Sequence, residues 1–213
     1  MNFADRLAAE RLVAILRAPD ADRFVAVSRA LYDAGWRVIE VTLTTAGALD
    51  AIGEVRAQLP DDALVGAGTV TTPADVQAVH AAGAQFAVSP VLDLPSVAAA
   101  DRLGLPFIPG SLTPTEIVAA WRAGCSAVKV SPVVSVGGPA YLELVGAFLP
   151  GIPLLPTGGV RPVDVPAYFA AGAVAVGIGG PLLGDALSDG ADLAALTQRA
   201  ATIVQEAGVG EPA

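Results

Sequence analysis

Several reactive residue types are nearly absent from the sequence, which has one lysine, one cysteine, one histidine and one methionine among 213 residues. A single cysteine, Cys125, cannot form an intramolecular disulfide, which is typical of a protein in a reducing compartment. A single histidine leaves no cluster of His and acidic ligands, so we expect no metal site. Only 15% of the residues are charged and 54% are hydrophobic, which is ample for a large core.

Positive charge is also scarce, since 12 basic residues face 21 acidic ones and the formal net charge is −9. No basic patch is visible, which argues against nucleic acid or an anionic membrane surface as a partner. No apolar run reaches the roughly 18 residues of a membrane span. Residues 1–10 lack the basic and then apolar pattern of a signal peptide. We therefore expect a soluble, cytoplasmic protein.

The chain alternates short apolar runs with Ala-rich segments of helical character. The predicted strands are Leu12–Leu16, Arg37–Leu43, Ala63–Ala67, Gln85–Ser89, Leu105–Pro109, Ser126–Ser131, Ile152–Pro156 and Val174–Gly177. The predicted helices are Asn2–Glu10, Asp20–Ala34, Ala46–Leu59, Pro73–Ala82, Leu94–Leu103, Pro114–Ala123, Pro139–Phe148, Pro162–Ala171, Pro181–Leu187 and Asp192–Glu206. Eight strand–helix units predict a parallel sheet. We expect a single compact (β/α)₈ (TIM) barrel domain over residues 1–213 with an extra N-terminal helix, and a doubly wound open sheet is the alternative.

The only lysine, Lys129, lies inside the predicted strand Ser126–Ser131 rather than on a polar helix face. Side chains alternate between the two faces of a strand. Val128 and Val130 would therefore face the surrounding helices, and Lys129 would point into the barrel. Because a charged group is costly in such a place, Lys129 is a candidate for function.

The second predicted strand places an acid in the same interior by the same argument. Ile39 and Val41 form its apolar face, so Glu40 points inward. A buried ion pair that holds two strands in register is the structural alternative, but such pairs are only weakly stabilising. The chemical interpretation is that Lys129 attacks a keto group and forms an iminium, which stabilises the carbanion left by C–C cleavage. Glu40 would move the protons.

Glycine pairs follow the seventh and eighth predicted strands, at Gly158–Gly159 and Gly179–Gly180. In barrels the loops at these two places often hold a phosphate group. One glycine pair is usually just a turn, but two pairs at these strand ends indicate an anion site. Arg17, at the end of the first strand, is a candidate cationic partner, and an ordinary surface arginine is the alternative.

The remaining histidine and cysteine have structural explanations. His80 lies on the predicted helix Pro73–Ala82, where an outer-surface or helix-packing position is expected. Cys125 lies beside a helix end and is expected to be a small packing residue rather than a nucleophile.

Seven stretches, in order over nearly the whole chain, resemble the aldolase family of 2-keto-3-deoxy-6-phosphogluconate (KDPG) and 4-hydroxy-2-oxoglutarate (KHG), which also covers phosphogalactonate aldolases. They are Val13–Arg17, Glu40–Leu43, Val65–Val70, Phe107–Gly110, Thr113–Glu116, Val128–Val130 with Pro132, and Pro156–Val160. The resemblance implies the barrel fold, a homotrimer, and a 4-hydroxy-2-keto acid that is reversibly split into pyruvate and an aldehyde.

The resemblance also implies roles for individual residues. Lys129 forms a covalent Schiff base with pyruvate, so no other cofactor is needed, and Glu40 is the general acid and base. The substrate-binding residues would be Arg17 for an anionic group, Thr69 for the pyruvyl carboxylate, Pro90 in the pocket wall, and Gly158 and Gly159 for a phosphate.

This chain departs from the pattern of phosphogluconate-cleaving members at three positions. Those members usually have Arg where this chain has Thr44, Phe where it has Ser131, and Ser near Gly180. The loss of the Arg and the Ser removes charge-assisted contacts to an anion. The sequence therefore leaves KDPG, its phosphogalactonate analogue and KHG open as substrates.

Two other functions stay open at this stage. A phosphosugar epimerase or isomerase would keep the glycine loops, but it has no need for an interior lysine in the sixth strand. A non-catalytic barrel that binds a phosphometabolite is favoured only by the altered anion residues. The presence of both Lys129 and Glu40 argues against it.

Overall fold

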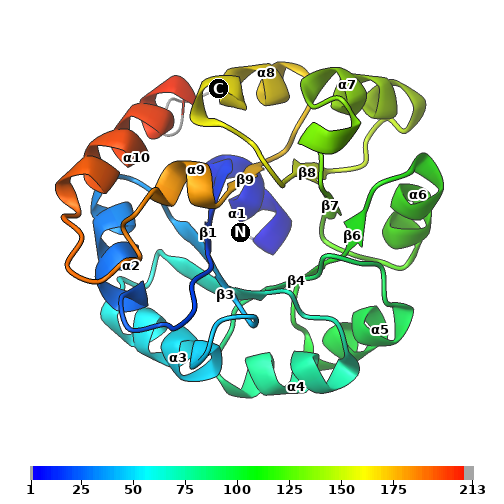
Figure 1. Ribbon diagram of the computed structural model, residues 1–213. Coiled ribbons are helices and arrows are strands. Elements are labelled where there is room, and N and C mark those ends of the chain that lie inside the picture. Colours follow the sequence, from blue (N-terminus) through cyan, green and yellow to red (C-terminus); the bar gives the residue numbers. More distant parts are fainter. Residues whose placement is uncertain (1, 209–213) are drawn as a thin grey trace.

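The computed structural model describes residues 2–208, in which strands and helices alternate along the chain (Figure 1). The strands are β1 Leu12–Leu16, β2 Val38–Thr42, β3 Leu64–Gly68, β4 Ala87–Val88, β5 Phe107–Ile108, β6 Gly110–Ser111, β7 Val128–Val130, β8 Leu154–Pro156 and β9 Val176–Ile178. The helices are α1 Phe3–Glu10, α2 Phe24–Asp33, α3 Ala48–Gln58, α4 Pro73–Ala81, α5 Leu94–Leu103, α6 Pro114–Arg122, α7 Pro139–Phe148, α8 Val165–Ala170, α9 Gly180–Leu183 and α10 Ala194–Glu206, with 3₁₀ turns η1 Val134–Val136 and η2 Pro162–Asp164.

The strands form two parallel sheets, one of six strands in the order β5-β4-β3-β2-β1-β9 and one of three in the order β6-β7-β8. The predicted strand Leu105–Pro109 is shorter than expected and gives way to a second one, because β5 pairs with β4 whereas β6 pairs with β7. Pro109 lies between them and has no N–H to donate to a ladder. Its carbonyl accepts a hydrogen bond from the Lys129 N–H at 3.0 Å.

The two sheets curve around a shared apolar interior, with the helices outside them (Figure 1). A bridge between Thr157 and Gly177, together with a hydrogen bond from Val174 N–H to the Leu154 carbonyl at 3.0 Å, connects the β8 side to the β9 side. α1 lies across the end of the strands at which β1 begins, and its Leu7 is buried in the interior cluster. The fold is thus an α/β fold with a curled parallel sheet.

Helix starts follow local signals that the sequence carries. Thr72 and Thr113 each accept a hydrogen bond from the backbone three residues on, while Asp75 and Glu116 bond back to the cap residue. These are capping boxes, and each is followed directly by a proline in the first turn. The boundaries predicted from Pro73 and Pro114 are confirmed.

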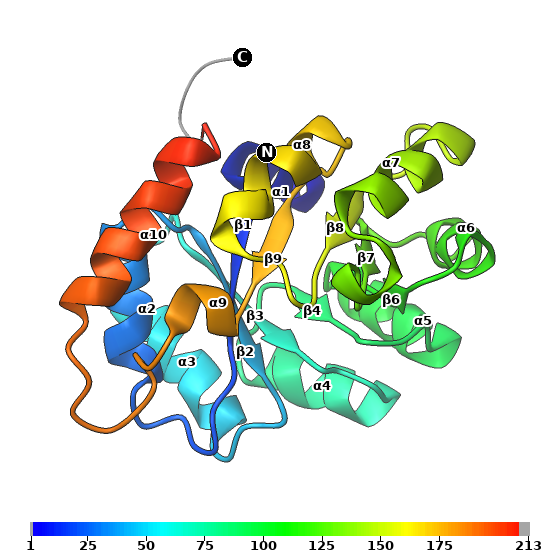
Figure 2. The same cartoon turned by 45° about the horizontal axis from the view of Figure 1, so that its top comes forward.

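Three predicted helices differ from the structure by more than two residues at one end. The segment Asp20–Ala34 becomes helical only at Phe24, where α2 begins. The segment Pro162–Ala171 begins with the 3₁₀ turn η2 before α8 starts. The segment Pro181–Leu187 is reduced to the four residues of α9, because Gly184 has a φ of +57° and a ψ of −124°, a non-helical conformation that glycine tolerates and that ends the helix. The last helix of the chain, α10, packs against α2 and α9 (Figure 2).

The alternation of faces in β2 and β7 is confirmed. Ile39, Val41, Val128 and Val130 belong to the large apolar core that the helices cover. Glu40 is buried on the other face, where it pairs in register with Ile15 of the interior cluster. Within residues 2–208, no helix is both long and apolar enough to cross a lipid bilayer.

Candidate active site

Lys129 lies at the centre of the three-stranded sheet. It pairs in register with Gly110 of β6 on one side and with Leu155 of β8 on the other. Leu155 belongs to the interior cluster, so the face that carries Lys129 is the interior face. Lys129 is only 7% exposed, so most of its side chain lies inside the protein.

Glu40 approaches Lys129 from the opposite sheet, with 3.8 Å between Glu40 Oε1 and Lys129 Nζ. Glu40 is 1% exposed, and neither of its carboxylate oxygens has a hydrogen-bond partner among the described residues. Gly68 of the neighbouring strand leaves the space that the carboxylate occupies, since a Cβ at Gly68 would overlap it. Buried carboxylates are normally paired and hydrogen-bonded, so this one is unusual.

The geometry argues against a purely structural ion pair. A separation of 3.8 Å is too long for a hydrogen bond, and a buried pair stabilises a fold only when its geometry is excellent and its remaining lone pairs are satisfied. Within residues 2–208, both Glu40 oxygens lack hydrogen-bond partners. The pair thus combines a carboxylate, which can act as a base, with an amine, which can act as a nucleophile, in one buried place.

Thr69 stands out by its backbone, because it is a β-branched residue with a φ of +62°. Such residues rarely adopt the left-handed region, and strain of this kind concentrates at functional sites. Thr69 directly follows β3, next to Gly68. Its Oγ1 accepts a hydrogen bond from Arg17 Nη2 at 3.2 Å, so two predicted site residues from different strand ends are brought together.

Arg17 also borders a cavity of about 330 Å³ at the ends of β1 and β9. The residues that line it are Ile15, Arg17, Ala18, Pro19, Gly179, Gly180, Leu183, Gly184, Leu187 and Ser188. The predicted glycine pair Gly179–Gly180 thus lies beside the predicted cation. Arg17 is the one cationic side chain in this lining, and the lining is otherwise largely apolar.

The other predicted residues lie at neighbouring strand ends. The backbone of Pro90 packs on Gly110, the strand partner of Lys129, so closely that a Cβ at Gly110 would overlap it. Thr44 is exposed in the loop after β2, where its hydroxyl donates to Thr42 Oγ1 at 3.4 Å. Thr44 thus lies two residues beyond the end of β2, whereas Thr42 is buried within the strand that carries Glu40.

The glycine pair Gly158–Gly159 packs under the loop that follows the Lys129 strand. A Cβ on Gly158 would lie 3.0 Å from Pro132 Cα, and one on Gly159 would lie 3.2 Å from Val134 Cβ. Both glycines also have left-handed φ values, of +91° and +81°. Close packing is therefore a sufficient reason for both glycines, in addition to any role toward an anion.

Sequence reasoning missed Gly68, Gly110 and Thr157 as parts of the site. The two glycines make room for Glu40 and for the Pro90 backbone, and Thr157 is 5% exposed at the end of β8. The strand register could have indicated Gly110, which pairs with Lys129, but not the other two residues, since Gly68 pairs with Thr42 and Thr157 bridges Gly177.

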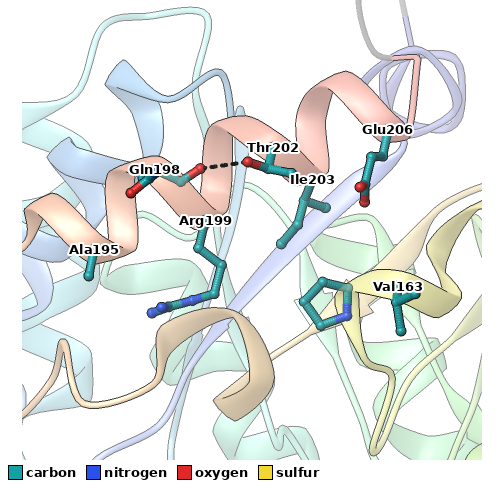
Figure 3. A pocket seen from close by; sticks show the side chains of 8 residues that line it. Val163, Ala195, Gln198, Arg199, Thr202, Ile203 and Glu206 are labelled. Carbon is teal, nitrogen blue, oxygen red and sulfur yellow. Dashed lines mark hydrogen bonds between the residues drawn. The ribbon is translucent and has the colours of Figure 1, made fainter.

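Outside this region, His80 is exposed on α4 and Cys125 is buried, as predicted. Burial raises the pKa of the Cys125 thiol to about 11. A second cavity, of about 500 Å³, lies between α10 and the η2 turn (Figure 3). None of the predicted site residues lines it.

Comparison with known proteins shows the family of this chain. The sequence profile described as KDPG and KHG aldolase matches residues 3–199. The KHG/KDPG aldolase of Escherichia coli (strain K12) is 36% identical over 181 residues, which is 84% of each chain. A 2-dehydro-3-deoxy-phosphogluconate aldolase of Dickeya dadantii (strain 3937) is 37% identical over 186 residues, which is 86% of each chain.

A solved structure extends this similarity to the fold. It is a KDPG aldolase from Legionella pneumophila with pyruvate captured as a covalent carbinolamine intermediate, and it matches with a TM-score of 0.87 and 26% identity. The match covers 95% of this chain and 98% of that one. Taken with the matched profile and the curated relatives, it leads to one conclusion: the chain belongs to the KDPG and KHG aldolase family.

Proposed function

We propose that this enzyme is a Schiff-base aldolase, a lyase that reversibly cleaves a 4-hydroxy-2-keto acid into pyruvate and an aldehyde. The observation that carries the proposal is the buried pair of Lys129 Nζ and Glu40 Oε1, 3.8 Å apart, with an unpartnered carboxylate. Family membership supports the same reaction. An epimerase or isomerase would leave this interior lysine without a task.

Lys129 is the nucleophile in this mechanism. Its uncharged amine attacks the C2 keto carbon of the substrate and gives a carbinolamine, which loses water and becomes an iminium. The iminium then accepts the electron pair of the C3–C4 bond as that bond breaks. The product on the lysine is an enamine, and the C4 carbon leaves as the carbonyl of the aldehyde.

Glu40 is the general acid and base. Its carboxylate accepts the C4 hydroxyl proton as the C3–C4 bond breaks, and the same group assists the proton transfers of carbinolamine dehydration. After the aldehyde leaves, C3 of the enamine is protonated, and water hydrolyses the iminium to release pyruvate and the free Lys129 amine. Each step runs in reverse for aldol addition, and no cofactor beyond the covalent intermediate is required.

The strand-end residues are the proposed substrate contacts. Thr69 seats the carboxylate of the pyruvyl half, with Pro90 in the wall. Arg17 and the loops at Gly158–Gly159 and Gly179–Gly180 receive the distal group, and Thr44 borders it. The hydrogen bond between Arg17 and Thr69 supports a shared site.

The candidate substrates are KDPG, its phosphogalactonate analogue and KHG. The 330 Å³ cavity beside Arg17 is large enough for a short distal group. A single guanidinium in its lining pairs with either a phosphate or a carboxylate. For this reason all three substrates stay in the proposal.

We further infer that the two sheets close as one complete (β/α)₈ barrel, a single domain over residues 1–213 with α1 covering one end. The bridge from Thr157 to Gly177 and the chain continuity from β5 to β6 support closure on both sides. A cytoplasmic homotrimer without nucleic-acid or membrane partners is the proposed state of the enzyme.

Borohydride reduction in the presence of pyruvate tests the reaction. Because Lys129 is the only lysine, the only competing amine is the N-terminus, and peptide mass spectrometry separates the two. We expect a pyruvyl-derived adduct on Lys129, followed by turnover of one of the three keto acids. Folded protein without that adduct would overturn the proposal.

A further inference from the structure

The segment that follows β9 forms one wall of the cavity beside Arg17. Gly179, Gly180, Leu183, Gly184, Leu187 and Ser188 all come from it. This wall segment, residues 179–188, contains the four-residue helix α9. A helix so short is not stable by itself, because nucleation costs more than a few hydrogen bonds return. Contacts from elsewhere must therefore hold the wall segment in place.

Arg199 of α10 supplies such contacts at the end of α9. Its Nε donates to the Leu182 carbonyl at 2.5 Å and its Nη2 donates to the Leu183 carbonyl at 3.0 Å. The last carbonyls of a helix have no partner within the helix, and a cation placed there also complements the helix dipole. In Figure 3 the Arg199 side chain extends away from α10, and these bonds show that it reaches α9.

Arg23, at the start of α2, holds the next part of the chain. Its Nε donates to the Ala186 carbonyl at 3.0 Å, and its Nη2 donates to the Ala191 carbonyl at 2.7 Å. Two arginines from two different helices thus bind four backbone carbonyls of one stretch. Neither arginine lines the cavity, so their contribution to it passes through the wall segment.

We propose that Arg199, assisted by Arg23, is a positioning residue that sets the affinity of the enzyme for the part of the keto acid beyond the C3–C4 bond. This inference rests on the proposed aldolase function. Lys129 and Thr69, which would take the pyruvyl half, lie on or beside other strands, and neither of them lines this cavity. Arg199 therefore affects one half of the substrate and leaves the other unchanged.

The fork of the guanidinium is suited to this task. Two parallel N–H groups reach two successive carbonyls, which a lysine ammonium cannot do with the same geometry. Gly184 closes over the guanidinium, and a Cβ there would lie 2.9 Å from Arg199 Nη2. Arg199→Lys should accordingly keep the charge and one of the two bonds.

The test compares Arg199→Ala and Arg199→Lys with Gln198→Ala. Gln198 is a neighbour on α10 that lines the 500 Å³ cavity together with Arg199 but makes no hydrogen bond to the wall segment among the described residues. For each variant, KM and kcat are measured for KDPG and KHG cleavage, and pyruvate adduct formation is measured by borohydride reduction. We expect Arg199→Ala to raise KM about tenfold, as the loss of charge-assisted hydrogen bonds implies, with pyruvate trapping unchanged. Arg199→Lys should give a smaller rise, and Gln198→Ala none.

Two results would overturn the inference: a KM for Arg199→Ala within about twofold of the wild-type value, which is less than the loss of one such bond implies, or a parallel loss of pyruvate trapping. If Arg199→Ala does not fold, Arg199→Lys and Arg23→Lys carry the same comparison, and an unchanged KM in both is equally decisive. Failure of the wild-type enzyme to trap pyruvate is a different outcome, because it removes the proposed function itself.

Discussion

Two ion pairs of this protein differ in how fully their carboxylates are satisfied. At the end of the strands near α1, Asp62 Oδ2 accepts a hydrogen bond from Arg37 Nε at 3.0 Å and Asp62 Oδ1 accepts one from Tyr32 Oη at 2.5 Å. In the interior, Glu40 Oε1 faces Lys129 Nζ at 3.8 Å, and neither Glu40 oxygen is hydrogen-bonded to any residue that the structure describes.

From this difference we expect the Arg37–Asp62 pair to contribute to stability and the Lys129–Glu40 pair to contribute to catalysis. The pair near α1 is partly exposed, and each Asp62 oxygen accepts one hydrogen bond. Through Tyr32 it joins α2 to the segment before β3, and its exposure keeps the desolvation cost small. The interior pair is buried and poorly satisfied, which costs stability without an evident structural gain. Proteins retain such groups where activity needs them. The four predictions below test this division, from the largest expected effect to the smallest.

Lys129→Arg should have the largest effect. The substitution keeps a positive charge opposite Glu40, but a guanidinium does not act as the nucleophile because it stays protonated. We expect aldol cleavage to fall to the background level and the pyruvate adduct to disappear, with a melting temperature close to that of the wild type. Steady-state assays, trapping and thermal unfolding measure the three quantities. Residual turnover with Lys129 replaced would assign the chemistry to another group.

Glu40→Gln should come second. The amide keeps the shape of the side chain but does not take up the proton, and loss of a general base typically costs about 10²–10⁴ in rate. We expect kcat to fall within that range while unfolding is little affected, since Glu40 makes no hydrogen bonds to lose. Retention of full kcat would contradict the acid–base role.

Asp62→Asn should reverse the pattern, with a loss of stability and unchanged turnover. The Tyr32 hydrogen bond, followed by the Arg37 charge, holds the pKa of the Asp62 carboxyl below its usual 3.8. A lowered folded-state pKa means that the contribution is present above about pH 4 and is lost as the pH falls through the folded value. We expect about 1 kcal/mol less unfolding free energy at neutral pH, given the exposure of the group, and no difference in strong acid.

Denaturant unfolding at two pH values measures this effect. Asp61→Asn is the matched control, because the neighbouring exposed aspartate has no comparable partners among the described contacts. An equal loss at both pH values would show that charge is not the cause.

Cys125 should give the smallest effect. It lies buried beside the end of α6, and burial raises the pKa of its thiol to about 11. Because the thiolate is the reactive form, we expect almost no labelling by iodoacetamide at pH 8 in the folded enzyme and full labelling after denaturation. Cys125→Ala should leave kcat unchanged. Rapid native labelling would show that this end of the protein opens more readily than its packing implies.

Much of the fold followed from local patterns. β1 and the helices α5 and α7 have the predicted boundaries, and the capped helices α4 and α6 end one residue early. Predictions were wrong where the outcome depends on partners distant in sequence. The predicted strand Leu105–Pro109 is reduced to Phe107–Ile108, which pairs with β4, and a separate strand that begins at Gly110 pairs with β7. Helix α9 is short because the chain turns at Gly184 beside Arg199.

The sequence by itself determined that Lys129 and Glu40 would both face the interior, because the two-residue period of a strand leaves no other place for them among apolar neighbours. Only the tertiary structure decided that they meet at 3.8 Å, that Gly68 leaves room for the carboxylate, and that Thr69 is held at a positive φ beside Arg17. It also decided that Arg23 and Arg199 hold the wall segment. Distances between strands that are far apart in the chain depend on how the sheets curve and pack, which a local pattern does not encode.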